Sequence, residues 1–409
     1  MDRLARIFRA ESGQVLASLV YFSRDLQLAE DALQDACEQA SNKWPVQGIP
    51  VNTSAWLHLV AKRKLIDKLR QQHSQQNQYK LQLIEDSLYM QPDTMAETDY
   101  DVPDERLRLI FTCCHPALNE AAQVALTLRT LCGLDVREIA RAYLTSEVAI
   151  GQRITRAKKK IRDAGISYEI PHSEQLKIRL PSVLKVIYLI YNESYSAYEG
   201  QSLTRHDLAN EAIRLSLLMV KLIPNAEVFG LAALMLFHDA RRSSRSSVDE
   251  PYIPLELQNR ALWDQELIEQ ANHFMQLALQ CKQRGPYQIQ AAISALHAKA
   301  TSWEATDWRQ IQLLYMSLLQ LLPSPVIELN LAIAKANGGQ LKQAYTDVLA
   351  LNDELHLYQP YHAACGELES RLQLPEKAYC SITKAINLSK NSIERDFLIT
   401  KRRLLIEKG

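Results

Sequence analysis

A face rich in basic and amide side chains recurs at helical spacing between residues 134 and 165. It carries Gln152, Arg153, Arg156, Lys159 and Lys160. From Arg137 to Asp163 there are eight Lys or Arg against three Asp or Glu. Guanidinium and amide groups hydrogen-bond to base edges, and ammonium groups neutralise phosphates. These residue types point to nucleic-acid recognition rather than to catalysis.

Two helices joined by a short turn would present this face. Asp135 is a candidate N-cap, and Glu138 follows three residues later, as a capping box requires. A second helix can begin at Thr145 or Ser146. Its inward side would hold Val148, Ile150, Ile154, Ala157 and Ile161. The pattern predicts a helix-turn-helix DNA reader, but a helical hairpin with a solvated basic face explains this stretch alone equally well.

The composition favours an all-α protein of two or three domains. The chain has 409 residues with only 12 Gly, and Leu, Ala, Gln, Glu, Lys and Arg dominate it. Lys plus Arg and Asp plus Glu number 47 each, so any nucleic-acid face must be local. No apolar run of membrane length and no signal peptide occurs, and the seven Cys include no C-x-x-C pair. We therefore expect a cytoplasmic protein that does not enter a membrane.

Two amphipathic helices are predicted at 2–23 and 26–41, and the second has an acidic outer face. Its buried stripe would consist of Leu26, Ala29, Leu33, Ala36 and Ala40. Its outer face would consist of Glu30, Asp31, Gln34, Asp35 and Glu38. Such a face could complement a basic partner, although most charge runs are simply solvated.

A third helix, predicted at 54–72, is basic on its outer side. Its five cations are Lys62, Arg63, Lys64, Lys68 and Arg70. Trp44 and Trp56 could stack on bases but fit a core better. From Leu81 to Glu105 there are eight acids and no Lys or Arg, which is typical of a solvated spacer.

Adjacent thiols and an imidazole at Cys113, Cys114 and His115 could suggest zinc. Tetrahedral zinc needs four ligands, and no second Cys/His pair lies nearby in the sequence. We therefore predict buried thiols beside a helix-terminal His, with no metal and no cofactor. Asn119 can cap a helix that begins at Glu120.

The C-terminal part of the chain predicts a series of paired helices. They are expected near 205–222, 226–240, 257–281, 286–301, 307–321, 325–337, 341–353, 358–372 and 375–388. The pair Ala344-Tyr345 recurs as Ala378-Tyr379, 34 residues later, which is typical of a helical solenoid. Several polar residues would pair between repeats or, alternatively, line a groove for a peptide or small ligand. They are Asn192, Glu193, His238, Asp239, Arg241, Arg242, His297, Asp307 and Trp308.

The N-terminal motifs resemble the extracytoplasmic-function (ECF) sigma factors of the sigma-70 family. Residues 25–35 follow the pattern D-x-x-x-A-E-D-x-x-Q-D of region 2.2. The string EIA at 138–140, with Ser146, Arg153 and Arg156, is similar to region 4. The resemblance implies that core RNA polymerase, through its β′ and β subunits, and promoter DNA are the partners. It also allows the acidic linker to cross a polymerase surface where nucleic acid would otherwise lie.

The resemblance also implies roles for individual residues. Polymerase contacts would come from Glu30, Asp31, Gln34 and Asp35. The −10 element would meet Gln47, Asn52, Thr53, Lys62, Arg63 and Arg70. The −35 element would meet Ser146, Ala149, Gln152, Arg153, Arg156 and Lys159. The chain departs from the family at Lys64, where Asn is usual.

Strings in the rest of the chain resemble the ECF42-type group, whose members carry a C-terminal repeat domain. They include FTCCHPAL at 111–118, LMLFHDARR at 234–242, GPYQIQAAI at 285–293 and ERDFL at 394–398. The last helix pairs look like tetratricopeptide repeats. Gly151 stands where the group usually has Ala.

These observations predict region 2 at 1–73, an acidic linker at 74–103, region 4 at 104–166 and a helical-repeat domain at 175–409. We predict a transcription initiation factor that is not an enzyme, aids promoter melting and is regulated by its fused repeats, which could bind a peptide or protein. The alternative is a one-component helix-turn-helix regulator, or a repeat scaffold, that acts without polymerase. No nucleophile elbow, phosphate loop or metal-ligand spacing supports an enzyme.

Overall fold

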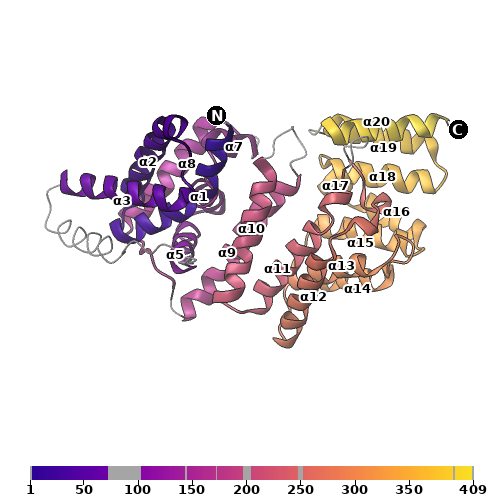
Figure 1. Ribbon diagram of the computed structural model, residues 1–409. Helices are drawn as coiled ribbons and strands as arrows, with labels where there is room; N and C mark the ends of the chain where they lie inside the picture. Colours follow the sequence, from indigo (N-terminus) through magenta and orange to yellow (C-terminus); the bar gives the residue numbers. More distant parts are fainter. Residues whose placement is uncertain are drawn as a thin grey trace. The chain divides into compact units, whose positions relative to one another are not determined.

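The chain folds into two compact helical units, Met1–Glu193 and Ser194–Gly409 (Figure 1). The computed structural model describes residues 2–71, 103–142, 145–171, 173–196, 204–246, 252–389 and 392–407. These described residues form helices and no strand, which confirms the all-α prediction. Most of the predicted 74–103 linker lies outside them. The unit boundary falls at Glu193, later than the predicted start of the repeat domain at 175.

The first three helices are α1 (Asp2–Ser23), α2 (Leu26–Gln47) and α3 (Thr53–Gln71), which pack against one another in every pair. Asp25 caps α2 by accepting the backbone N–H groups of Gln27 and Leu28 at 2.9 and 3.1 Å. The core between the three helices is formed by Val15, Leu19, Leu26, Ala29, Leu33, Leu57, Leu65 and Leu69. The predicted starts of these helices are correct to within a residue.

Helix α2 extends past its predicted end at residue 41 and contains Pro45. Proline usually ends a helix because it lacks an N–H donor. Here Trp44 is 3% exposed, and its ring lies 5.7 Å from that of Phe8 and 5.2 Å from that of Trp56. These contacts of the Trp44 ring with α1 and α3 stabilise the last turn of α2. Gly48, with φ +88°, then ends the helix by donating its N–H to the Trp44 carbonyl at 3.0 Å.

The other helices of the first unit are α5 (Pro103–Cys113), α6 (Glu120–Thr130), α7 (Val136–Ala142), α8 (Glu147–Asp163) and α9 (Ser173–Ser196), whose last three residues fall in the second unit. Asn119 caps α6, as predicted, by accepting the Ala122 N–H at 2.9 Å. The thiols of Cys113 and Cys114 are fully buried and lie 3.3 and 3.9 Å from the hydroxyls of Thr130 and Thr127. The prediction of buried thiols is therefore confirmed.

The second unit is a succession of helices in which neighbours along the chain pack together. They are α10 (Thr204–Leu222), α11 (Ala226–Asp239), α12 (Gln265–Gln280), α13 (Pro286–Lys299), α14 (Trp308–Leu321), α15 (Pro325–Asn337), α16 (Leu341–Ala350), α17 (Asn352–Leu355), α18 (Gln359–Arg371), α19 (Pro375–Leu388) and α20 (Ser392–Glu407). The helix predicted from 257 begins only at Gln265. Asp264 caps it there, and 3₁₀ turns at Leu255–Leu257 and Arg260–Leu262 precede it.

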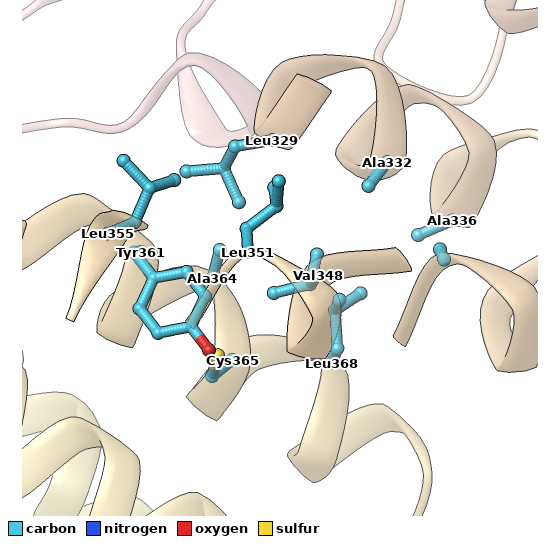
Figure 2. Close-up of a cluster of buried hydrophobic side chains, with 11 residues drawn as sticks. Leu329, Ala332, Ala336, Val348, Leu351, Leu355, Tyr361, Ala364, Cys365 and Leu368 are labelled. Atoms are coloured by element: carbon cyan, nitrogen blue, oxygen red, sulfur yellow. The ribbon is translucent and has the colours of Figure 1, made fainter. Parts of the chain in front are cut away.

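Burial in the last helices repeats with the predicted 34-residue offset. Ala344 and Val348 of α16 are fully buried, and so are their counterparts Ala378 and Ile382 of α19. Figure 2 shows the core that α15, α16 and α18 build around Val348. Gly366 brings α18 close to α19, because a Cβ there would lie 2.5 Å from Cγ1 of Ile382. Each helix pair therefore completes its core with the next one.

Candidate nucleic-acid interface

The geometry of α7 and α8 is that of a capped helix-turn-helix. The Glu138 N–H donates to Asp135 Oδ1 at 2.7 Å, and the Asp135 N–H donates to Glu138 Oε2 at 2.9 Å, which is a reciprocal capping box. Ser146 caps α8 by accepting the Ala149 N–H at 3.2 Å. The inward side of α8 is buried at Ile150, Ile154, Ala157 and Ile161. Val148, predicted on this side, is instead 69% exposed.

The outer side of α8 presents the predicted −35 residues to solvent. Ser146, Gln152, Arg156 and Lys159 are exposed, and Ala149 and Arg153 are half-buried. No ion pair within the described part of the chain involves Arg153, Arg156 or Lys159. Their donors are therefore available to an anionic ligand, and the amide and guanidinium groups can also read bases.

The acidic side of α2 is only partly as predicted. Gln34 is exposed, and Asp31 and Asp35 are half-buried at the surface. Asp31 accepts a hydrogen bond from Gln27 at 2.9 Å, and Asp35 pairs with Lys68 of α3 at 3.0 Å.

The outward orientation expected for Glu30 is wrong. Its carboxylate forms an ion pair with Lys158 of α8, and each of the two side chains is 18% exposed. The pair joins residues 128 positions apart in the sequence. Sequence reasoning also missed Lys158, because no local pattern distinguishes it from the cations beside it.

The predicted −10 residues divide into surface residues and one core residue. Gln47, Asn52, Arg63 and Arg70 are exposed, and Thr53 is half-buried. Asn52 also caps α3 by accepting the Ala55 N–H at 2.9 Å. The surface position expected for Lys62 is wrong.

Lys62 is 5% exposed, and its ammonium lies 4.7 Å from the centre of the Phe22 ring. Burial lowers the pKa of Lys62, and the charge of Glu105 partly opposes this shift. Two apolar side chains that the sequence analysis did not select are exposed here: Val46 (85%) in the last turn of α2 and Val51 (108%) in the loop before α3. Each of these valines directly follows a proline, Pro45 or Pro50, and this pattern could have identified them in the sequence.

No group of three His, Cys, Asp or Glu side chains in the described ranges is arranged to ligate a metal ion. No described helix combines the length and apolarity needed to span a bilayer.

Three known protein families match successive segments of the chain. Residues 7–75 match the family described as Sigma-70 region 2, and residues 108–161 match the one described as Sigma-70, region 4. Residues 179–279 match a family of unknown function (DUF6596). The chain is 40% identical over 387 residues to an uncharacterized protein of Rhizobium meliloti (strain 1021), covering 94% of this chain and 92% of that protein.

Proposed function

The chain belongs to the sigma-70 family, and on that premise we propose that it is an ECF-type sigma factor that selects specific promoters. Sigma-70 factors act in transcription initiation and are not enzymes. The observation that carries the proposal is the capped α7–α8 pair, whose outer Arg153, Arg156 and Lys159 form no ion pair with any described residue, within the same unit as α2. Run-off transcription with core polymerase and the chain's own upstream DNA tests it. A one-component regulator would bind that DNA but would direct no transcription from it.

Core polymerase would dock on the outer side of α2. Asp31, Gln34 and Asp35 remain accessible there, and a basic coiled coil of β′ would complement them. The variant Asp31→Arg/Gln34→Arg should keep its fold and lose co-purification with core enzyme. Glu269→Arg, at an exposed position of α12, is a control charge reversal outside this face and should bind normally. Normal core binding by the α2 variant would refute this assignment.

The −35 element would be read by the outer face of α8. Loss of a bidentate Arg–base contact costs about 1–3 kcal/mol and relaxes specificity at one base pair. Arg153→Ala and Arg156→Ala should therefore change the ranking of mutated −35 sequences. Lys159→Ala should weaken binding to all of them alike. If the arginine variants lost the same affinity for every −35 sequence, these arginines would contact only phosphates.

The −10 element would be read by the segment from Gln47 to Thr53. Arg63 and Arg70 would contact the phosphates of the same DNA strand. A base can be held this way only after it leaves the stack. The fluorescence of 2-aminopurine at that base should rise as the open complex forms. An unchanged signal during productive transcription would refute the loop's role.

The second unit would be a tetratricopeptide-like domain that regulates the first, in a protein of the cytoplasm. The repeated burial of Ala344 with Val348 and of Ala378 with Ile382 supports the repeat assignment. Repeats of this kind offer an extended surface to a peptide or protein. A chain cut after Ser196 should be constitutively active if the domain inhibits, and inactive if it assists polymerase. We favour assistance. Equal activity of the cut and whole chains under all conditions would refute regulation.

A further inference from the structure

A cleft of about 510 Å³ lies in the first unit, between the start of α2 and the end of α8. One of its walls is formed by residues 24–27, and the other by residues of α8 and of the segment that follows this helix as far as Tyr168. Small-molecule sites in proteins typically have volumes of about 300–1,000 Å³. The cleft is therefore large enough to enclose a small molecule.

The lining of the cleft carries an excess of positive charge. Its cationic residues are Arg24, Lys158, Lys159 and Arg162. Among the described residues that line it, Asp25 alone is acidic, and its carboxylate already caps α2. Glu30 balances Lys158, and Arg162 pairs only with its sequence neighbour Asp163, at 3.5 Å in an exposed contact. The described ranges contain no ion pair of Arg24 or Lys159. An anion in the cleft would complete this charge balance.

Arg24 stands at a position where the backbone favours glycine. Its φ of +55° lies in the left-handed region, which is unfavourable for a residue with a Cβ. Its guanidinium donates to the Tyr168 carbonyl at 3.0 Å, and this bond crosses the cleft because the two residues belong to opposite walls. Strained residues of this kind cluster at functional sites. The bond orients the guanidinium at the cleft, and its other N–H groups can meet an anion.

The cleft also has an apolar part, which is buried. Leu26, Ile161 and Tyr168 are 4%, 3% and 6% exposed, whereas the cations that lack a strong partner are exposed. Arginine binds phosphate oxygens through two parallel N–H groups, and a lysine ammonium adds a point charge. Several cations suit a ligand with several negative charges better than a single carboxylate. The lining therefore fits a diphosphate, with room for an organic group against the apolar part.

We propose that this cleft is a binding site for a small molecule that carries a diphosphate group. The diphosphate would lie between Arg24 on one wall and Lys159 and Arg162 on the other. Any organic group attached to it would lie against Leu26 and Ile161. The site goes beyond the proposed sigma-factor function, and its test requires neither polymerase nor promoter, so each can fail without the other.

Isothermal titration calorimetry of the full-length protein with inorganic pyrophosphate, in magnesium-free buffer, tests the site. We expect saturable binding of a single pyrophosphate, weakened by added salt because the cations are exposed. Arg24→Gln and Arg162→Gln should keep the fold and should each weaken binding about three- to tenfold. Arg156→Gln is the matched control, because Arg156 is an exposed arginine of the same helix that does not line the cleft. Its affinity for pyrophosphate should equal that of the unchanged chain.

Titration with ADP separates two sources of the diphosphate. Tighter binding of ADP than of pyrophosphate would identify an organic diphosphate, whose nucleoside part uses the apolar lining. Equal or weaker binding of ADP would identify inorganic pyrophosphate. In either case the loss caused by Arg162→Gln should be the same for both ligands, because the arginine meets the group that they share.

Hydrogen–deuterium exchange locates the bound anion. Saturating pyrophosphate should raise protection in peptides that cover residues 24–27 and in peptides that cover 155–168, with peptides of the second unit as the reference. Three results would overturn the site. They are an absence of saturable binding at millimolar pyrophosphate, an equal loss of affinity in Arg156→Gln and Arg162→Gln, and protection that spares residues 24–27. The last two would mean that pyrophosphate is attracted only to the general basic surface of α8.

Discussion

Replacing either of two helical glycines with alanine should have opposite effects on local stability. Both Gly13 of α1 and Gly151 of α8 lie inside helices, where alanine is favoured over glycine by about 1 kcal/mol. At Gly151 a Cβ would meet nothing within 4 Å. Gly151→Ala should therefore stabilise α8 by nearly the full propensity difference.

At Gly13 the same change meets an obstacle. Its Cβ would lie 2.2 Å from the Leu131 oxygen and 3.0 Å from the Leu131 carbonyl carbon. Non-bonded carbons prefer about 3.5–4.0 Å, so α1 and the end of α6 must separate by roughly 1 Å. Both obstructing atoms belong to the backbone and cannot rotate away. Overpacking of this kind costs about 1–3 kcal/mol, which offsets or exceeds the propensity gain.

Hydrogen–deuterium exchange of the full-length protein can measure the difference segment by segment. Relative to the unchanged chain, Gly13→Ala should lose up to about 2 kcal/mol of protection around Leu131, or up to roughly 30-fold in exchange rate, whereas Gly151→Ala should gain protection in α8. Peptides from the second unit serve as the reference. If Gly13→Ala instead raised protection around Leu131, the close approach of α1 to the end of α6 would not exist in solution.

Three further predictions concern other parts of the chain. Acidification from pH 7 to 5 should lower the free energy of unfolding of the second unit, and His297→Gln should remove about 2 kcal/mol of that dependence. Burial and two neighbouring arginines hold the pKa of His297 at about 4, so the unfolded chain takes up the proton first; calorimetry at both pH values checks this. Gly366→Val should destabilise the same unit by about 1–3 kcal/mol, and adding Ile382→Ala should cost less than the sum of the single changes in thermal unfolding. A thiol reagent should label exposed Cys380 in the native protein, but Cys113, whose pKa burial raises to about 12, only after unfolding, as peptide mass spectrometry would show.

The features that the sequence predicted well depend on neighbours along the chain. The capping box at Asp135 and Glu138, the caps at Asn119 and Ser146, and the buried stripe of α8 apart from Val148 formed as expected. Each follows from a spacing of three or four residues, which helix geometry alone determines. The 34-residue offset between Ala344 and Ala378 is predictable for the same reason, because each repeat packs mainly on the next.

The features that the sequence missed depend on distant partners. The predicted end of α2 at residue 41 was too early, because the rings that hold Trp44 come from α1 and α3. Charge patterning placed Glu30 and Lys62 on the surface, since it cannot see that Lys158 and the Phe22 ring lie opposite them. A charged side chain can be buried when the fold places a partner beside it, and otherwise it stays in solvent.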